Sequence, residues 1–385
     1  MTANTLDSLM QTALTSVAPA ITLVAYRRGK PVVNRAWGYI DPDNRQIPVT
    51  VEALFDLASV TKLFTVSTFL VLASQKGIAL DTPVVQFLPE FGIENPRSIE
   101  GGQDAHTKEM LPVVPDLADH TVDPSSVTIW HLLTHTSGLP PWRDVYTIAP
   151  PPEPAAGYTR QYRWQLALQR LVTYPFVDTV GAGIHYSDIG LMLLGEIVAR
   201  LHGTSLEEAI QHHVLSPLNL SDTMFNPTIG REQIAPTEYD ATWRCRRVWG
   251  EVHDENACGL GGVAGHAGLF GSASSVARFG LAWLTQQTLQ ISPSLWQQAI
   301  TEQVKDGPER RGLGWMLRSE ENSSAGDLMS MESFGHTGFT GTSLWIDPTR
   351  ELVVALLTNR VYWGRDPAGI HRLRRAVHDA LVRET

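Results

Sequence analysis

The sequence predicts an α/β (α+β) fold in which a central antiparallel sheet, flanked by helices, carries an inserted and mostly helical domain. Strand patterns occur near both ends of the 385-residue chain, helical patterns fill its middle, and no internal repeat divides it. Hydrophobic residues make up 43% of the sequence, enough for one large core or two interleaved cores. The order of strands, helices and strands therefore indicates one sheet built from both ends of the chain.

The first predicted elements are a helix and a hairpin. Residues 6–17 carry apolar side chains at helical spacing. Residues 21–41 follow as two strands around the turn Arg28-Gly29-Lys30. We expect this hairpin to begin the antiparallel sheet.

The middle of the chain is predicted to be helical. A helix starts at Ser59 and stops at Gly77, a typical C-terminal residue. Two polar stretches rich in Gly, Pro and Asp, at 92–126 and 140–157, interrupt this region, and long loops of this kind often form lids or binding walls. Further helices are predicted over 129–135, 161–173, 188–202, 205–214 and 274–287.

The end of the chain returns to strand character. Residues 341–360 form a predicted hairpin whose turn, 347–350, has proline at the favoured second position. We therefore assign the sheet-containing domain to the discontinuous segments 1–58 and 262–385, and the helical domain to 59–261.

Composition excludes several classes of function. A net charge of -10 and the lack of a basic run argue against a nucleic-acid partner, and no apolar stretch has the length of a membrane span. Cys245 and Cys258 cannot build a disulfide framework, so we expect two free thiols. Because no signal-peptide pattern is visible, we expect a cytoplasmic protein, with an exported form whose leader has been removed as the alternative.

Common catalytic and cofactor motifs are missing. The sequence has neither G-x-S-x-G nor H-E-x-x-H. His131 and His135 are four residues apart but lack a glutamate between them, and we interpret both as satisfying local hydrogen bonds. Similarly, 253–256 is interpreted as a cap and turn, and the glycine-rich 259–265 as a poor dinucleotide fingerprint. We therefore expect neither a metal nor an organic cofactor.

One motif suited to covalent chemistry remains, Ser59-Val60-Thr61-Lys62. Its spacing places the serine oxygen and the lysine nitrogen on one helix face, near the positive end of the helix dipole. A lysine among apolar neighbours loses part of its preference for the charged form and can act as a base, which arginine cannot. The alternative is that Ser59 caps the helix and Lys62 reaches solvent.

Two later segments favour the catalytic interpretation. Tyr186-Ser187-Asp188 stands at the entrance of an apolar helix, and His336-Thr337-Gly338 begins the strand that leads into the closing hairpin. The order S-x-x-K, Y-S-(N/D), (K/H)-T-G resembles the penicillin-recognising serine enzymes, in particular the group of class C β-lactamases, D-alanyl-D-alanine carboxypeptidases and related esterases. The segments 130–140, 186–198, 215–225 and 335–348 are also similar to that group.

The resemblance implies a β-lactamase/transpeptidase-like fold with the active site in a cleft between the two domains. Ser59 would attack a carbonyl, and Lys62 and Tyr186 would share the transfer of its proton. The backbone N–H groups of Ser59 and Phe339 would form the oxyanion hole. No metal or cofactor is needed for this reaction.

The remaining implied site residues are Thr337, Gly338, His336 and Asp188, and two of them bear on the substrate. His336 replaces the usual lysine and would line the opposite wall beside Thr337, while Gly338 allows the substrate to approach closely. Asp188 stands where β-lactamases have asparagine. We therefore expect an ester, peptide or β-lactam substrate, with esterase or peptidase-like activity favoured. The alternatives are a true class C β-lactamase, a non-catalytic binding protein of the same fold, and a metal-dependent hydrolase.

Overall fold

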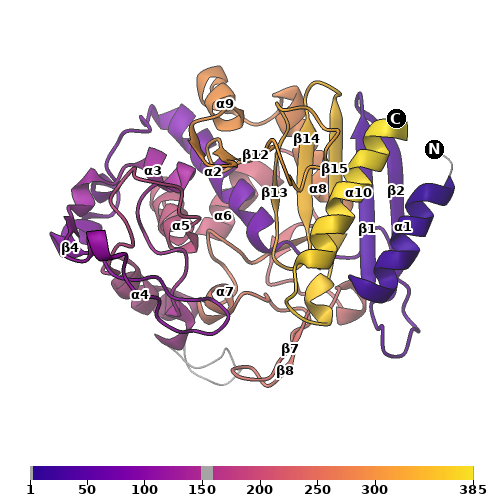
Figure 1. The fold of residues 1–385 in the computed structure, drawn as a ribbon, viewed down its shortest axis with the longest axis horizontal. Coiled ribbons are helices and arrows are strands. Elements are labelled where there is room, and N and C mark those ends of the chain that lie inside the picture. The colour runs from indigo at the N-terminus through magenta and orange to yellow at the C-terminus, as the bar shows by residue number, and fades with distance from the viewer. Residues whose placement is uncertain (1–2, 149–158, 385) are drawn as a thin grey trace.

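An eight-stranded antiparallel sheet is the main element of the computed structural model, which describes residues 3–148 and 159–384 (Figure 1). The strand order is β10-β11-β12-β13-β14-β15-β1-β2, so strands from the two ends of the chain lie side by side as predicted. The strands are β1 (Ala20–Arg27), β2 (Lys30–Gly38), β10 (Val304–Asp306), β11 (Glu309–Arg311), β12 (Met316–Leu317), β13 (Phe334–Thr337), β14 (Ser343–Asp347) and β15 (Leu352–Thr358).

Helices cover both faces of this sheet. α1 (Ala3–Ser16) and α10 (Ala368–Glu384) lie together on one face, and α8 (Ala273–Thr285) packs on the other (Figure 1). The predicted hairpin at 341–360 is confirmed by β14 and β15, whereas the helix α10 that follows it was not predicted. The apolar residues of α10 recur every three or four positions and join the core on that face, at Ile370, Leu373, Val377 and Leu381.

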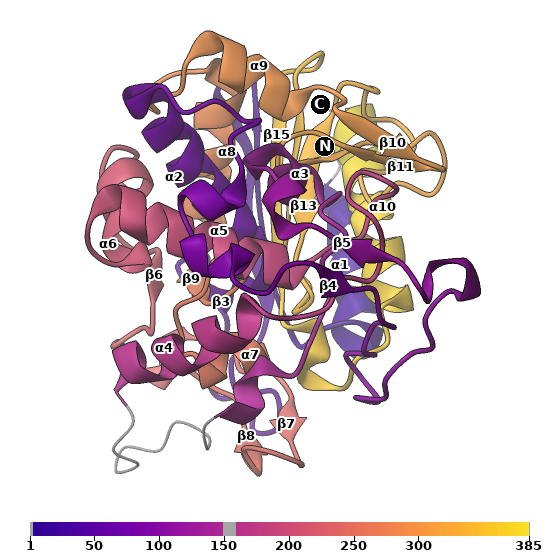
Figure 2. The same ribbon diagram turned by 90° about the vertical axis from the view of Figure 1, so that its left-hand side faces the viewer.

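The helical part of the molecule lies beside the sheet (Figures 1 and 2). Its predicted helices are present, except that the last turns of 205–214 are a π-helix, Gln211–Leu215. The longer helices are α2 (Thr61–Lys76), α4 (Arg160–Leu171), α5 (Asp188–His202) and α9 (Pro293–Ile300); the shorter ones are α3 (Ile129–Thr134), α6 (Leu206–Ile210) and α7 (Glu255–Gly259). In the described part of the chain, seven strands of two or three residues form small sheets outside the main one: β3 (Phe55–Asp56), β4 (Arg97–Ser98), β5 (Thr121–Val122), β6 (Met224–Phe225), β7 (Tyr239–Asp240), β8 (Arg246–Arg247) and β9 (Leu269–Gly271).

Of the two polar stretches, 92–126 consists mainly of turns around β4 and β5. Residues 149–157 of the second stretch lie outside the described residues. Cys245 is an exposed free thiol and Cys258 a buried one, as expected. Within 3–148 and 159–384, no single helix is long and apolar enough to cross a membrane; α5 and Leu206–Leu215 reach that length only as a pair bent by 75°.

Helix α2 is the central element that positions the candidate site. All of its residues from Thr61 to Ala73 are buried, and the helix packs against α5 and α6. Phe64 stacks on Phe279 of α8 with ring centroids 4.2 Å apart. The helix ends where Gly77 takes up a left-handed conformation, as predicted. A helix buried over this length holds the residues at its N-terminal end in a fixed place.

Candidate active site

Ser59 lies in a 3-10 turn, Ala58–Val60, directly before α2. The turn is sharp, with Ala58 at φ 47°, and its backbone is held by a 2.8 Å hydrogen bond from Ala58 N to the buried carboxylate of Asp56. Lys62 Nζ donates a 2.7 Å hydrogen bond to Ser59 Oγ. Ser59 caps neither helical turn and Lys62 is only 1% exposed, so the capping and solvent-reaching alternatives are wrong.

The ammonium group of Lys62 is surrounded by acceptors. Asp188 Oδ1 lies 2.8 Å from Nζ, and the backbone carbonyl of His266 accepts a hydrogen bond of 3.2 Å. Burial by itself lowers the pKa of Lys62, but Asp188 and Tyr186 outweigh it and raise the pKa above its ordinary value. Lys62 is therefore protonated at rest, and its ammonium group donates the hydrogen bond that the Ser59 oxygen accepts.

Tyr186 lies between two neutral histidines and two cations. Its ring centroid is 4.7 Å from that of His135 and 5.9 Å from that of His336, and Lys62 Nζ lies 4.8 Å from it. Arg311 Cζ is 5.1 Å from the same centroid. Burial, together with the neighbouring cations, holds the pKa of both histidines well below the ordinary value. The charge beside the Tyr186 ring therefore comes from Lys62 and Arg311.

Asp188 is the first residue of α5, but it does not cap the helix. Ser187 is the cap, since its Oγ accepts a 3.0 Å hydrogen bond from Gly190 N. The Asp188 carboxylate instead faces Lys62 of α2, a helix that lies much earlier in the sequence.

The turn between β13 and β14 is fastened to the Ser59 segment. Thr342 Oγ1 donates a 2.8 Å hydrogen bond to Leu57 O, and Gly338 N bonds Thr342 O within the turn. A Cβ on Gly338 would lie 2.6 Å from Leu57 O and 2.1 Å from Thr342 Oγ1, so only glycine fits there. The contact brings Phe339 to the same cavity as Ser59.

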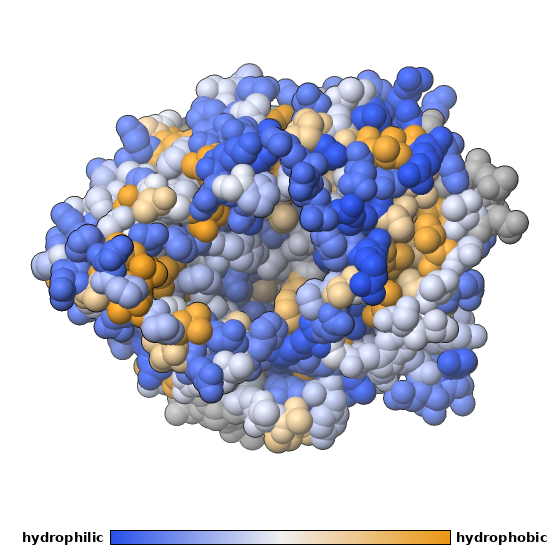
Figure 3. All heavy atoms as spheres, in the orientation of Figure 1, coloured by the Kyte–Doolittle hydropathy of each residue, from blue (hydrophilic) through white to orange (hydrophobic). Residues whose placement is uncertain are grey.

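This cavity has a volume of about 340 Å³. On the face seen in Figure 3 the molecule is hollowed between the helical part and the sheet, with mostly hydrophilic surface around the hollow. The cavity brings together six residues predicted from the sequence, while Lys62 and Asp188 lie behind Ser59 and Tyr186. Its walls are formed by Ser59, Tyr186, Arg311, Met316, His336, Thr337, Gly338, Phe339, Arg360, Pro367, Ile370 and Arg374.

Three arginines of the cavity wall carry no sequence motif and were not predicted. Arg374 and Arg360 support the turn, through a 3.0 Å hydrogen bond to Gly338 O and a 2.8 Å bond to Phe339 O. Arg311 is buried and pairs with Glu309 through Nε and Nη2. In the described part of the chain its Nη1 has no hydrogen-bond partner. Arg311 lines the cavity beside Tyr186, so its guanidinium adds positive charge to that wall.

Asp254 and His266 are further residues that the sequence reasoning missed. Asp254 caps α7, as expected, but its Oδ1 also lies 2.9 Å from His266 Nε2. Together with Asp188 they offer ligand atoms within 4.8 Å of one another, the one such group of three among the residues described. The nearest cation to this group is the ammonium of Lys62, 2.8 Å from Asp188. We therefore interpret these three residues as a polar group that surrounds and stabilises the Lys62 ammonium.

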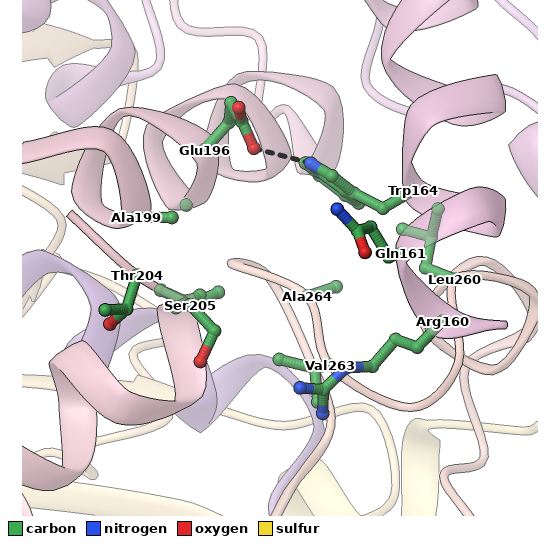
Figure 4. A pocket seen from close by; sticks show the side chains of 12 residues that line it. Arg160, Gln161, Trp164, Glu196, Ala199, Thr204, Ser205, Leu260, Val263 and Ala264 are labelled. Atoms are coloured by element: carbon green, nitrogen blue, oxygen red, sulfur yellow. Dashed lines mark hydrogen bonds between the residues drawn. The ribbon is translucent and has the colours of Figure 1, made fainter. Parts of the chain in front are cut away.

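A second cavity, of about 350 Å³, lies between α4, α5, α6 and the segment after α7 (Figure 4). Its walls are mainly apolar, and Trp164 donates a hydrogen bond to Glu196 at its rim. Ser205, which lines it, is occupied as the cap of α6. The pairing of a serine with a base is found in the cavity of Ser59 and not among these walls.

The chain is similar in sequence to proteins that are, by their names, an amidase and a carboxypeptidase. The chain is 29% identical to the N-acetylmuramyl-L-alanine amidase of Bacillus subtilis, over 92% of this chain and 80% of that protein. It is 27% identical to a protein of Escherichia coli named "Putative D-alanyl-D-alanine carboxypeptidase", over 89% of this chain and 78% of the relative.

Solved structures share the fold at lower identity. A class C β-lactamase superposes with a TM-score of 0.70 at 18% identity, covering 98% of this chain and 95% of the other. EstCE1, described as a hydrolase with promiscuous acyltransferase activity, gives 0.69 at 20% identity, covering 97% of each chain. The sequence profile of the Beta-lactamase family matches residues 4–379. The chain therefore belongs to the β-lactamase family, a family of serine hydrolases.

Proposed function

We propose that this protein is a serine hydrolase that forms an acyl-enzyme at Ser59. The observation that carries the proposal is the 2.7 Å contact between Ser59 Oγ and the buried Lys62 Nζ, at the wall of an open cavity. A serine beside a desolvated amine, in a site with room for a substrate, is the arrangement that nucleophilic catalysis requires.

In the proposed reaction, Lys62 first releases its resting proton to solvent. Ser59 Oγ then attacks the substrate carbonyl, and the serine proton passes to the pair of Lys62 and Tyr186, while Asp188 holds the lysine in place. The N–H groups of Ser59 and Phe339 stabilise the oxyanion, and each such donor contributes about 2.7–4 kcal/mol in comparable enzymes. The same pair then protonates the leaving group. Water then attacks the acyl-enzyme and gives a proton to the same pair. That proton returns to Ser59 Oγ as its bond to the acyl carbon breaks and the acid product leaves.

We propose an ester or a D-amino-acid amide or peptide as the substrate class. A neutral His336 provides no fixed positive charge, and Asp188 cannot donate a hydrogen bond to an amide carbonyl when ionised. The guanidinium of Arg311 on the cavity wall, whose Nη1 has no hydrogen-bond partner among the described residues, supports a substrate that carries a carboxylate. The names of the relatives, an amidase and a carboxypeptidase, favour the same class. The second candidate is a class C-type β-lactamase, which the fold favours.

Covalent labelling tests the proposal. A fluorophosphonate or a fluorescent penicillin should add one adduct to the intact protein, as read by mass spectrometry. The adduct should be lost in Ser59→Ala and kept in Ser294→Ala, a matched control at an exposed serine. An adduct of full stoichiometry in Ser59→Ala would overturn the assignment. A parallel screen of p-nitrophenyl esters, a chromogenic cephalosporin and D-amino-acid amides then ranks the substrate classes.

A further inference from the structure

Three histidines outside the proposed active site meet where the end of α5 faces the turn after α6. His202 is the last residue of α5, and His212 and His213 belong to the π-helical turn Gln211–Leu215. His202 Nδ1 lies 3.1 Å from His213 Nε2. The His212 ring centroid is 4.7 Å from that of His213 and 5.6 Å from that of His202. Single π-helical turns occur frequently at functional sites.

The ring nitrogens of this cluster are in a form that can bind a metal. The contact between His202 and His213 needs a lone pair on one nitrogen, so the two facing nitrogens share one proton. An imidazole nitrogen with a free lone pair is a good ligand for zinc, copper and nickel.

We propose that His202 and His213, joined by His212, form a binding site for a divalent transition-metal ion of the zinc, copper or nickel class. Two imidazole nitrogens on a tetrahedral zinc ion, at about 2.0–2.1 Å each, stand roughly 3.3–3.4 Å apart. The observed 3.1 Å between the facing nitrogens is close to this separation. The ion takes the place of the shared proton, which leaves to solvent.

The third ligand needs only a side-chain rotation. His212 is exposed, so its ring is free to turn toward the ion, while His202 and His213 are half-buried and already face each other. Water completes the coordination. The charged groups around the cluster are Lys76, which opposes the ion, and Glu208, whose carboxylate interacts favourably with His202.

The site is independent of the proposed hydrolysis. Asp188 and His202 are the two ends of α5, a helix of 15 residues, which at 1.5 Å per residue places them about 20 Å apart. A bound ion would tie α5 to the segment that follows α6. Its expected effect is on stability, because an ion that binds only the folded chain shifts unfolding by mass action.

Calorimetric titration with Zn²⁺ alone tests the proposal, using the untagged full chain in a Cys245→Ser background so that the exposed thiol does not compete. We expect one equivalent to bind and the melting temperature to rise. Even outer-shell partners of a metal are worth 10–100-fold in affinity, so His202→Ala and His213→Ala should each weaken binding by at least about tenfold. His213→Gln, which keeps the size and polarity, should do the same, whereas the exposed control His120→Ala should bind like the parent.

Other outcomes would overturn the site. If the parent binds no zinc, or if binding survives both His202→Ala and His213→Ala, the cluster is not a metal site. If binding is lost instead in His266→Ala, the ion occupies the group around Lys62. Labelling of Ser59 in each variant reports folding separately, so a failure of the metal site is distinguishable from a failure of the proposed reaction.

Discussion

Lys62 holds Ser59 and Asp188 at nearly the same distance, 2.7 Å to the serine oxygen and 2.8 Å to the carboxylate. Ser59 is thus linked through one ammonium group to an acidic residue on another helix. The strength of that link decides how readily the lysine gives up its proton.

Replacing Asp188 with Asn should move the pH dependence of the reaction. Asp188 raises the pKa of Lys62, so its removal lowers that pKa and makes the neutral amine available at lower pH. We expect the alkaline-rising limb of kcat/KM to shift to lower pH in Asp188→Asn. The asparagine can also donate a hydrogen bond, so the ratio of kcat/KM for a cephalosporin over a short-chain ester should rise. Rate profiles for both substrates across pH provide the measurement, and an unmoved ratio with an unmoved limb would show that Asp188 is not coupled to the chemistry.

Lys62 and Tyr186 should behave as one proton-transfer unit, since the lysine nitrogen lies 4.8 Å from the centre of the tyrosine ring. Lys62→Met and Tyr186→Phe should each lower kcat by about 10²–10⁴-fold, a typical general-base contribution. The double variant should lose much less than the product of the two single losses. Steady-state kinetics on the four proteins measure this, and fully multiplicative losses would mean that the two residues act separately.

Arg311 should select substrates that carry a carboxylate. Its buried Nη1 lacks a partner in the described structure, and a hydrogen bond to a charged group is worth about 1.5–3 kcal/mol. We expect Arg311→Ala to raise KM for such substrates by roughly ten- to a hundredfold and to leave neutral esters little changed. The neighbouring Arg310, which pairs with Glu302 outside the cavity, supplies the control Arg310→Ala. Equal losses on charged and neutral substrates would remove Arg311 from recognition.

Gly338→Ala should lower kcat in steady-state kinetics. The added Cβ would press on Leu57 O and push the turn that carries Phe339 away from Ser59. Loss of one oxyanion donor costs about 10²–10³ in kcat. The control is Gly102→Ala, whose Cβ would meet only Leu111 Cδ1 at 3.6 Å. A kcat within a few-fold of the parent in Gly338→Ala would argue against an oxyanion hole at Phe339.

The sequence predicted helices and strands well where the residues that determine them lie close together in the chain. The helix that starts after Ser59 has a glycine stop, and the first hairpin has Arg28 and Gly29 in the left-handed conformation that a two-residue turn requires. Residues of the site that belong to motifs were found for the same reason. The C-terminal helix α10 was not predicted, although its apolar residues recur at helical spacing with charged residues between them, the pattern of a surface helix.

The rest of the site could not be read from the sequence, because it is assembled by tertiary contacts. His266 reaches Lys62 across 204 positions of the chain, and it does so through its backbone carbonyl, which no residue type encodes. Asp254 was correctly predicted to cap a turn, yet that role hides its second contact with His266. Arg311 lies on a short strand with no motif around it.

The pairing of β1 with β15 has a consequence for how the chain is made. Tyr26 of β1 pairs with Val353 of β15, which lies 327 positions later in the chain (353 minus 26). During synthesis, β1 is therefore complete long before its partner strand exists. At roughly 5–20 residues per second, this interval lasts from about 15 s to a minute. During this time the apolar β1–β2 hairpin exposes an open edge of unpaired N–H and C=O groups, a template for pairing with other chains. The newborn protein is therefore most vulnerable to aggregation on the ribosome, and a chaperone that covers this edge should raise the yield of folded enzyme more than one that acts after release.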